Sequence, residues 1–256
     1  SLIMEINSKS GLYPLLAAYN IYRNRLETAK EKYGEVSNAF SLQLWDLTIE
    51  QNILVVCKTP MARSITRRTL AGFRDTKVHA EYYKNLIENI SQNSDLVVNT
   101  LRDGKYFWGI NDNKCMTIDA IIGNPPYQVV DGGGNGTAAM PIYNKFVCVA
   151  KDMHPHYISM IMPAKWYGGG RGLDDFREMM LNETHIDYIK DFPNPKSVFP
   201  TANISGGVCI FRWSKEHNSN VAMFVNTINE TEIASKRQLN EFLQYDIFPR
   251  YNEAVA

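Results

Sequence analysis

The stretch AIIGNPPYQ, residues 120–128, is an apolar run that ends in a glycine, an asparagine, two prolines and a tyrosine. Each proline fixes its own φ angle and has no backbone N–H to donate. The groups left to point outward are acceptors, the Asn124 side-chain oxygen and the Pro125 carbonyl, beside the flat face of Tyr127. This set suits an aromatic exocyclic amine, because each acceptor takes one N–H and both stabilise the positive charge that grows on a nucleophilic nitrogen. The alternative is a rigid turn with a packed tyrosine.

The regions around this stretch alternate between strand-like and helix-like patterns, which predicts an α/β domain with a largely parallel sheet. NILVVCK (residues 52–58) is a continuous apolar run of the kind found in strands covered on both faces. DLVVNTL (residues 95–101) is also predicted to be a strand, and AEYYKNLIENISQ (residues 80–92) a helix. IDYIKDF and GGVCIFRW have no convincing helix between them, so one strand is expected to run antiparallel.

Composition restricts the possible classes of protein. The chain has 256 residues, 45% of them hydrophobic, which suffices for one sizeable core. Lys plus Arg and Asp plus Glu number 27 each, whereas a stand-alone nucleic-acid-binding domain is usually basic. The four cysteines are scattered and suggest reduced, buried thiols, and no apolar run reaches membrane-spanning length. Both ends look cut, as in a piece of a longer protein.

The motif Asn124-Pro125-Pro126-Tyr127 resembles the catalytic motif of amino-group DNA methyltransferases, which use S-adenosylmethionine to methylate N6 of adenine. The resemblance is closest to the methylase region of type IIG-like restriction–modification enzymes. It implies a Rossmann-like class I methyltransferase fold with a mostly parallel seven-stranded sheet, one antiparallel strand and helices on both faces. It also implies a catalytic domain over residues 1–215. Residues 216–256 are expected to begin a linker or target-recognition region.

The resemblance places the cofactor-binding residues near the start of the chain, in MEINSKSGLYPL (residues 4–15). The family has an acidic residue at the end of its first strand, then a turn of small residues and a glycine that opens a helix. Glu5 and Gly11 match these positions, and Asn7 and Ser8 lie in the turn. A glycine lets the backbone approach a ligand, and a helix N-terminus favours a carboxylate.

Two further cofactor positions are less clear in the sequence. Asp103 matches the acidic residue near the cofactor adenine, although a turn aspartate is an equal alternative. No carboxylate follows NILVVCK where the family binds the ribose, so that partner stays unassigned. Asn124 is expected to contact the cofactor as well as the substrate.

The segment SVFPTANISGGVCIFRW (residues 197–213) resembles the late motif of the family, whose phenylalanine stacks on an extruded base. Phe199 matches this residue. With Tyr127 it is expected to enclose a flipped adenine, as enzymes that modify a duplex base require. Trp166 is expected to be a core aromatic residue. His154 and His156 lack a metal-binding spacing, so no metal site is predicted.

Three further stretches carry weaker signals. GGGRG (residues 168–172) and DGGGNG (residues 131–136) are predicted to be loops, and for GGGRG the alternative of a phosphate cradle is the weaker one. The basic run from Arg63 to Arg74 fits either a phosphate-tracking surface or a solvated helix face.

The leading hypothesis is the adenine-N6 methyltransferase domain of a restriction–modification system. Its expected partner is double-stranded DNA, with the rest of a longer polypeptide and no membrane. The implied location is the bacterial cytoplasm, at the nucleoid. The alternatives are a protein-glutamine N5 methyltransferase, whose family also uses NPPY, and a non-catalytic fragment.

Overall fold

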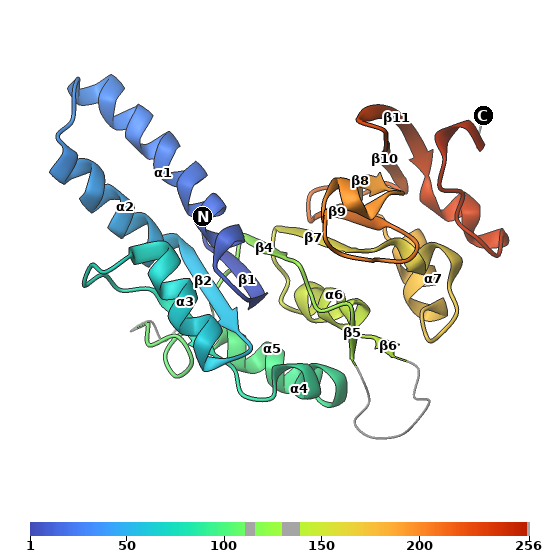
Figure 1. The fold of residues 1–256 in the computed structure, drawn as a ribbon, viewed down its shortest axis with the longest axis horizontal. Coiled ribbons are helices and arrows are strands. Elements are labelled where there is room, and N and C mark those ends of the chain that lie inside the picture. Colours follow the sequence, from blue (N-terminus) through green and yellow to red (C-terminus); the bar gives the residue numbers. More distant parts are fainter. Residues whose placement is uncertain (111–115, 130–138, 255–256) are drawn as a thin grey trace. The chain divides into compact units, whose positions relative to one another are not determined.

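The computed structural model describes residues 1–110, 116–129 and 139–254. The DGGGNG stretch and Cys115 lie outside the described residues. The chain forms two compact units (Figure 1). Unit 1 comprises Ser1–Gly123 with Asp152–Pro155, and unit 2 comprises Asn124–Lys151 with His156–Ala256. No helix of the described residues is long and apolar enough to cross a membrane.

Unit 1 is a parallel sheet with helices. Its strands are β1 (Ile3–Ser8), β2 (Ile53–Cys57), β3 (His79–Tyr82) and β4 (Ala120–Gly123). Its helices are α1 (Leu12–Tyr33), α2 (Asn38–Asn52), α3 (Pro60–Ala71), α4 (Leu86–Gln92) and α5 (Ser94–Arg102). The strand order is β4-β1-β2-β3, and every neighbouring pair is parallel. The carboxyl ends of β1 and β4 therefore lie at the same edge of the sheet.

The hydrophobic run of β2 explains its central place. All five of its residues are buried, and its neighbours on the two sides are β1 and β3. Ile53, Val55 and Cys57 belong to one core cluster with Ala18 of α1 and Leu70 of α3. Alternate residues of a strand face opposite sides, so this cluster fills one face of the sheet.

Two predictions of secondary structure in unit 1 are wrong. DLVVNTL is helix α5, because the Asn93 side chain caps it by accepting from Leu96 N at 3.2 Å, and its buried residues fall at helical spacing. The segment predicted as one helix over residues 80–92 begins as strand β3 and becomes helical only at α4. Parallel pairing with β2 overrides the local helical preference there.

Unit 2 contains a mixed five-stranded sheet. Its strands are β7 (Tyr157–Pro163), β8 (Ile186–Phe192), β9 (Val208–Ser214), β10 (Val221–Ile228) and β11 (Thr231–Gln238). Strand β9 lies between β7 and β8 and runs antiparallel to both, β10 is parallel to β8, and β11 is antiparallel to β10. The unit also has the short antiparallel pair β5 (Gln128–Val129) and β6 (Met140–Pro141), helices α6 (Tyr143–Asp152) and α7 (Asp174–Asn182), and 3₁₀ helices η1 (Ala164–Gly168), η2 (Pro195–Ser197), η3 (Leu239–Gln244) and η4 (Asn252–Ala254).

The predicted α/β class with a mostly parallel sheet is confirmed, but its details differ. The two units contribute four and five sheet strands in the described residues, rather than seven in all. In unit 2 two strands, β9 and β11, run antiparallel to their neighbours, where one antiparallel strand was predicted. The two additional strands, β10 and β11, follow residue 215. They form a hairpin whose two loop residues, Asn229 and Glu230, both have positive φ, as this type of turn requires. The boundary at residue 215 stays a prediction.

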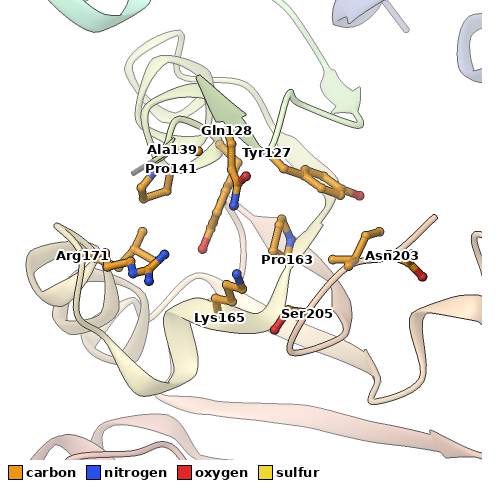
Figure 2. A pocket seen from close by; sticks show the side chains of 12 residues that line it. Tyr127, Gln128, Ala139, Pro141, Pro163, Lys165, Arg171, Asn203 and Ser205 are labelled. Atoms are coloured by element: carbon orange, nitrogen blue, oxygen red, sulfur yellow. The ribbon is translucent and has the colours of Figure 1, made fainter. Parts of the chain in front are cut away.

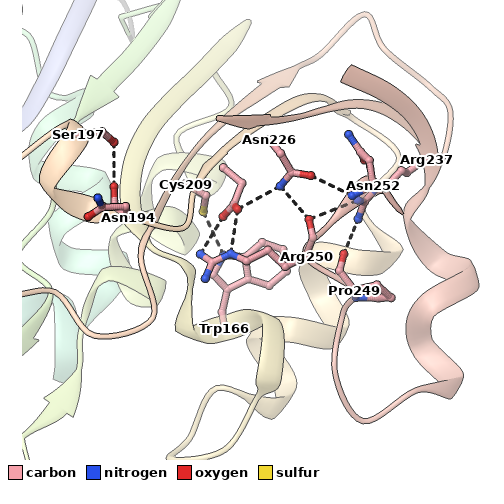
Figure 3. Close-up of polar contacts among 10 residues, drawn as sticks. Trp166, Asn194, Ser197, Cys209, Asn226, Arg237, Pro249, Arg250 and Asn252 are labelled. Atoms are coloured by element: carbon pink, nitrogen blue, oxygen red, sulfur yellow. Dashed lines mark hydrogen bonds and ion pairs between the residues drawn. The ribbon is translucent and has the colours of Figure 1, made fainter. Parts of the chain in front are cut away.

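A buried polar network fixes the last described residues of unit 2 (Figure 3). Asp191 on β8 has no exposed surface and accepts two hydrogen bonds from Arg250, at 2.8 and 2.9 Å. Asn226 on β10 donates to the Arg250 carbonyl at 2.9 Å. Arg237 on β11 donates to the Pro249 carbonyl and lies over the ring of Phe224. The segment after η3 is therefore bound to three strands.

Candidate active site

The NPPY motif directly follows strand β4. β4 ends at Gly123, and the next residue of the chain, Asn124, is half-buried, as are Pro126 and Tyr127. Pro125 is buried. Ile142 donates a backbone hydrogen bond to the Tyr127 carbonyl at 3.3 Å, which anchors the end of the motif beside the β5–β6 pair. The motif thus has the position predicted for it, at the carboxyl end of a strand.

The Asn124 side chain is available to a ligand. Among the described residues, no hydrogen bond occupies its amide group. A half-buried amide with a free carbonyl oxygen provides an acceptor that does not have to break an internal bond before it binds substrate. Pro125 adds a second acceptor, its backbone carbonyl. Because proline has no N–H, this residue offers a ligand an acceptor and no donor.

A cavity of about 230 Å³ lies next to Tyr127, within unit 2 (Figure 2). Small-molecule sites typically measure roughly 300–1,000 Å³, so this space suits one planar group rather than a large ligand. Its wall is formed by Tyr127, Gln128, Ala139, Pro141, Tyr143, Pro163, Lys165, Arg171, Leu173, Asn203, Ile204 and Ser205. The wall combines flat apolar surfaces with a few polar groups, and two of these are cations.

Phe199, the predicted second stacking residue, is not among the residues that line this cavity. It is half-buried just after η2, where its backbone N–H donates to the Pro195 carbonyl at 2.8 Å. The same segment instead brings Asn203, Ile204 and Ser205 to the cavity wall. The late motif therefore contributes to the cavity through other residues, and stacking by Phe199 stays a prediction.

Trp166 is fully buried, which confirms its predicted place in the core. Its indole N–H donates to Cys209 Sγ at 3.4 Å, and its ring stacks with that of Phe248. Cys209 and Cys57 are both buried thiols, as predicted, whereas Cys148 is only half-buried. The described residues hold no group of three or more His, Cys, Asp or Glu side chains that could bind a metal ion.

The predicted cofactor-binding residues at the start of the chain lie together in unit 1. Glu5 sits in β1 opposite Val55 of β2 and Ile122 of β4, and only 4% of it is exposed. Its Oε2 is buried and has no hydrogen-bond partner among the described residues. Burial raises the pKa of Glu5 to about 7, although a hydrogen bond with Ser8 lowers it. A buried carboxylate oxygen without a partner fits a ligand that brings a donor, such as an ammonium or hydroxyl group.

The end of β1, which includes Asn7 and Ser8, and the turn that follows it have a strained, well-defined shape. Asn7 has a φ of 77°, and Gly11, at the N-cap of α1, has a φ of 76°. Ser8 Oγ accepts from Gly11 N at 3.0 Å. A Cβ at Gly11 would lie 3.1 Å from Thr66 Cα, so the space beside this glycine is filled by helix α3. Asn7 and Ser8 are buried with Glu5, and the four residues form one compact segment.

The weaker cofactor positions have local structural roles. Asp103 follows α5, and its Oδ1 accepts from the backbone of Lys105 at 3.0 Å and of Tyr106 at 2.9 Å. This is the geometry of a turn aspartate, and its contact with a cofactor stays a prediction. After β2, the Thr59 side chain caps α3 by accepting from Ala62 N at 3.1 Å. No carboxylate side chain stands directly after β2, where the family binds the ribose of the cofactor, so the residue that binds the ribose stays unassigned.

The sequence did not point to Lys165 in the cavity, and it pointed to Arg171 only through the weaker alternative of a phosphate cradle in GGGRG. Lys165 lies in η1, directly after β7, and Arg171 lies in the GGGRG stretch. The available signal was a lone arginine inside a run of glycines. Its place beside Tyr127 depends on the fold of unit 2, which brings together residues more than forty positions apart in the chain.

The chain is similar in fold to solved structures and matches one protein family in its sequence. The fold is similar to that of the M protein of the type I restriction enzyme EcoKI, with a TM-score of 0.55 and 9% identity, over 88% of this chain and 44% of that chain. It is also similar to the type IIG restriction endonuclease BpuSI, with a TM-score of 0.52 and 10% identity, over 97% of this chain and 29% of that chain. These two likenesses show that the chain shares the fold of both proteins.

The family model described as the Eco57I restriction-modification methylase matches residues 51–199, more than half of the chain. The chain therefore belongs to this family, which confirms the resemblance seen in its sequence. An uncharacterized adenine-specific methylase of Mycoplasma pneumoniae is 37% identical over 130 residues, which cover 48% of this chain and 31% of that protein. The chain thus spans less than a third of the length of that relative and less than half of the EcoKI M protein.

Proposed function

We propose that this chain is the catalytic region of a DNA adenine-N6 methyltransferase of a restriction–modification system. The observation that carries the proposal is the Asn124–Tyr127 motif, which follows strand β4 and adjoins a base-sized cavity in a chain of the Eco57I methylase family. The adenine-specific methylase of Mycoplasma pneumoniae supports adenine as the substrate base.

In the proposed mechanism, the Asn124 side-chain oxygen and the Pro125 carbonyl each accept one hydrogen bond from the adenine amino group. Both oxygens stabilise the positive charge that develops on N6 as its lone pair forms the new N–C bond and the bond between the methyl carbon and the sulfur of the donor breaks, and this lowers the barrier. Tyr127 stacks on the extruded base and fixes its plane. The proton released from N6 leaves through the acceptor oxygens to solvent. Phe199 is proposed as a second stacking residue.

Residues of β1 and of the turn that follows it fit S-adenosylmethionine, which supplies the electrophilic methyl group when bound. We assign its binding to Glu5, Asn7, Ser8 and Gly11. The buried Oε2 of Glu5 has no partner among the described residues and suits the ammonium group of the cofactor. Asp103 and Asn124 are proposed as further contacts.

Methyl transfer from radiolabelled S-adenosylmethionine to mixed-sequence duplex DNA tests the proposal. We expect label in DNA, on N6 of adenine, and none in a glutamine-containing release-factor-like protein. Label in the protein alone would support the protein-glutamine alternative instead, and label in neither would support a non-catalytic fragment.

Asn124→Ala tests the mechanism. We expect this variant to lose methyl transfer while its affinity for S-adenosylmethionine, measured by calorimetric titration, stays within a few-fold of wild type. Asn218→Ala, which removes an exposed amide of unit 2, is the matched control and should keep full activity. Near-normal turnover by Asn124→Ala would contradict the proposed role of the amide.

A further inference from the structure

The cavity beside Tyr127 has an unbalanced charge. Lys165 and Arg171 belong to its wall, and none of the described residues that line it is an aspartate or a glutamate. Figure 2 shows the nitrogen atoms of both side chains directed toward the same space, on the side away from the ring of Tyr127. Asp174 is close to Arg171 in the chain, but its Oδ1 accepts from Gly170 N and it does not line the cavity, so the two cations make this space attractive to an anion.

The charges of both side chains are available. Within the described part of the chain, neither Lys165 nor Arg171 forms an ion pair or a side-chain hydrogen bond. Other arginines of unit 2 are engaged: Arg212 pairs with Asp187 at 2.8 Å, and Arg250 pairs with Asp191 at 2.8 Å. An arginine that only stabilised the fold would be expected to have such a partner.

The backbone at Arg171 is strained. Residues 169–172 all have positive φ, with values of 60°, 73°, 49° and 78°, and Arg171 is the one residue of the four that is not glycine. Asp174 maintains this shape, because its Oδ1 accepts from Gly170 N at 2.7 Å. A side chain in the left-handed region is unfavourable where glycine would fit without strain. Strain of this kind tends to be kept at binding sites.

The position of Lys165 is also set by its surroundings. A Cβ at Gly206 would lie 3.2 Å from Cγ of Lys165, so the missing side chain of this glycine leaves room for the lysine stem. Lys165 comes two residues after Pro163, which itself lines the cavity. Its ammonium group can therefore reach the cavity from the end of strand β7.

We infer that Lys165 and Arg171 form a phosphate-binding pair that holds the backbone of the DNA strand next to the extruded adenine. The inference rests on the proposed function and names a contact that the NPPY motif does not provide. The apolar wall and Tyr127 suit the base, and the two cations suit the phosphodiester groups that flank it. A base leaves the duplex only when its backbone rotates, so cations that bind the rotated phosphates favour the extruded state.

Fluorescence anisotropy with a labelled mixed-sequence duplex tests this inference. The dissociation constant is measured at several salt concentrations for the wild-type chain, Lys165→Gln and Arg171→Gly. We expect each substitution to weaken binding several-fold and to reduce the slope of log Kd against log salt concentration by about 1, because each removes one phosphate contact. Affinity for S-adenosylmethionine should not change.

Lys215→Gln is the matched control. Lys215 is exposed and follows Ser214, at the end of β9 opposite to Val208, which pairs with Pro163 at the cavity. It removes the same charge from the same unit, and we expect the salt slope to stay at its wild-type value. Arg171→Gly also separates binding from folding: because glycine relieves the strain at this position, the midpoint of thermal unfolding should not fall.

The outcomes separate this inference from the proposed function. An unchanged salt slope in both variants, with adenine methylation by the wild-type chain, overturns the phosphate-binding pair and leaves the proposed function intact. A reduced slope in both variants, with no methylation by wild type, supports the pair and counts against the proposed reaction. A wild-type chain that neither binds nor methylates duplex DNA overturns both.

Discussion

The buried carboxylate of Glu5 gives the sharpest test of unit 1, through the variant Glu5→Gln. Glu5 is 4% exposed, its Oε2 has no partner among the described residues, and burial raises its pKa from 4.5 to about 7. Ionising it inside the folded protein is therefore unfavourable. Glutamine has nearly the same shape as the protonated acid and cannot ionise, so it isolates the effect of the charge.

The sign follows from the raised pKa. A group that binds its proton more tightly when folded stabilises the fold fully below the unfolded pKa of 4.5, and this contribution is lost as the pH rises through about 7. With about 1.4 kcal/mol per pKa unit, the whole effect is about 3 kcal/mol. Between about pH 5 and about pH 8, the wild-type chain should lose about 2.5 kcal/mol that the variant keeps.

Urea unfolding followed by circular dichroism, at about pH 5 and about pH 8, measures this difference. Other titrating groups affect both proteins equally, so the relevant quantity is the change with pH in the stability of the variant relative to wild type. Glu5→Gln should become relatively more stable at the higher pH and should also bind S-adenosylmethionine more weakly. A stability difference that is the same at both pH values would refute a buried, unpaired carboxylate at this position.

Three further predictions concern the packing. Arg250→Ala should lower the free energy of unfolding by about 3–5 kcal/mol, because it leaves the buried Asp191 without its counter-charge. The double variant Asp191→Leu with Arg250→Met should recover most of this loss, as measured by urea unfolding. Equal losses in the single and double variants would contradict this reasoning. Gly11→Ala should destabilise by about 2 kcal/mol, seen as a lower thermal midpoint, since φ is 76° and the new Cβ would lie 3.1 Å from Thr66. Trp166→Ala should cost about 3–5 kcal/mol in urea unfolding through the cavity it leaves, and Trp166→Phe clearly less.

Local sequence patterns predicted the fold where hydrophobicity and backbone chemistry agree. NILVVCK was correctly identified as a buried strand, because five consecutive apolar residues can be buried only where both faces are covered. DLVVNTL was misread for a related reason: a short apolar run fits a strand or a buried helix, and the Asn93 cap decided in favour of the helix. Strand β3 was missed because its stability comes from pairing with β2 rather than from its own residues.

In the candidate site, too, the sequence determined some features and the tertiary structure decided others. By itself, the sequence determined the NPPY motif, its place after an apolar strand and the family of the chain, because prolines, an amide and a ring carry their chemistry wherever they are placed. Only the tertiary structure decided which residues surround Tyr127. It brought Lys165, Arg171 and residues 203–205 to the cavity, left Phe199 outside its wall, and removed Glu5 from water. These outcomes depend on contacts between segments far apart in the chain. A local sequence pattern does not contain the burial and the charge environment that such contacts produce.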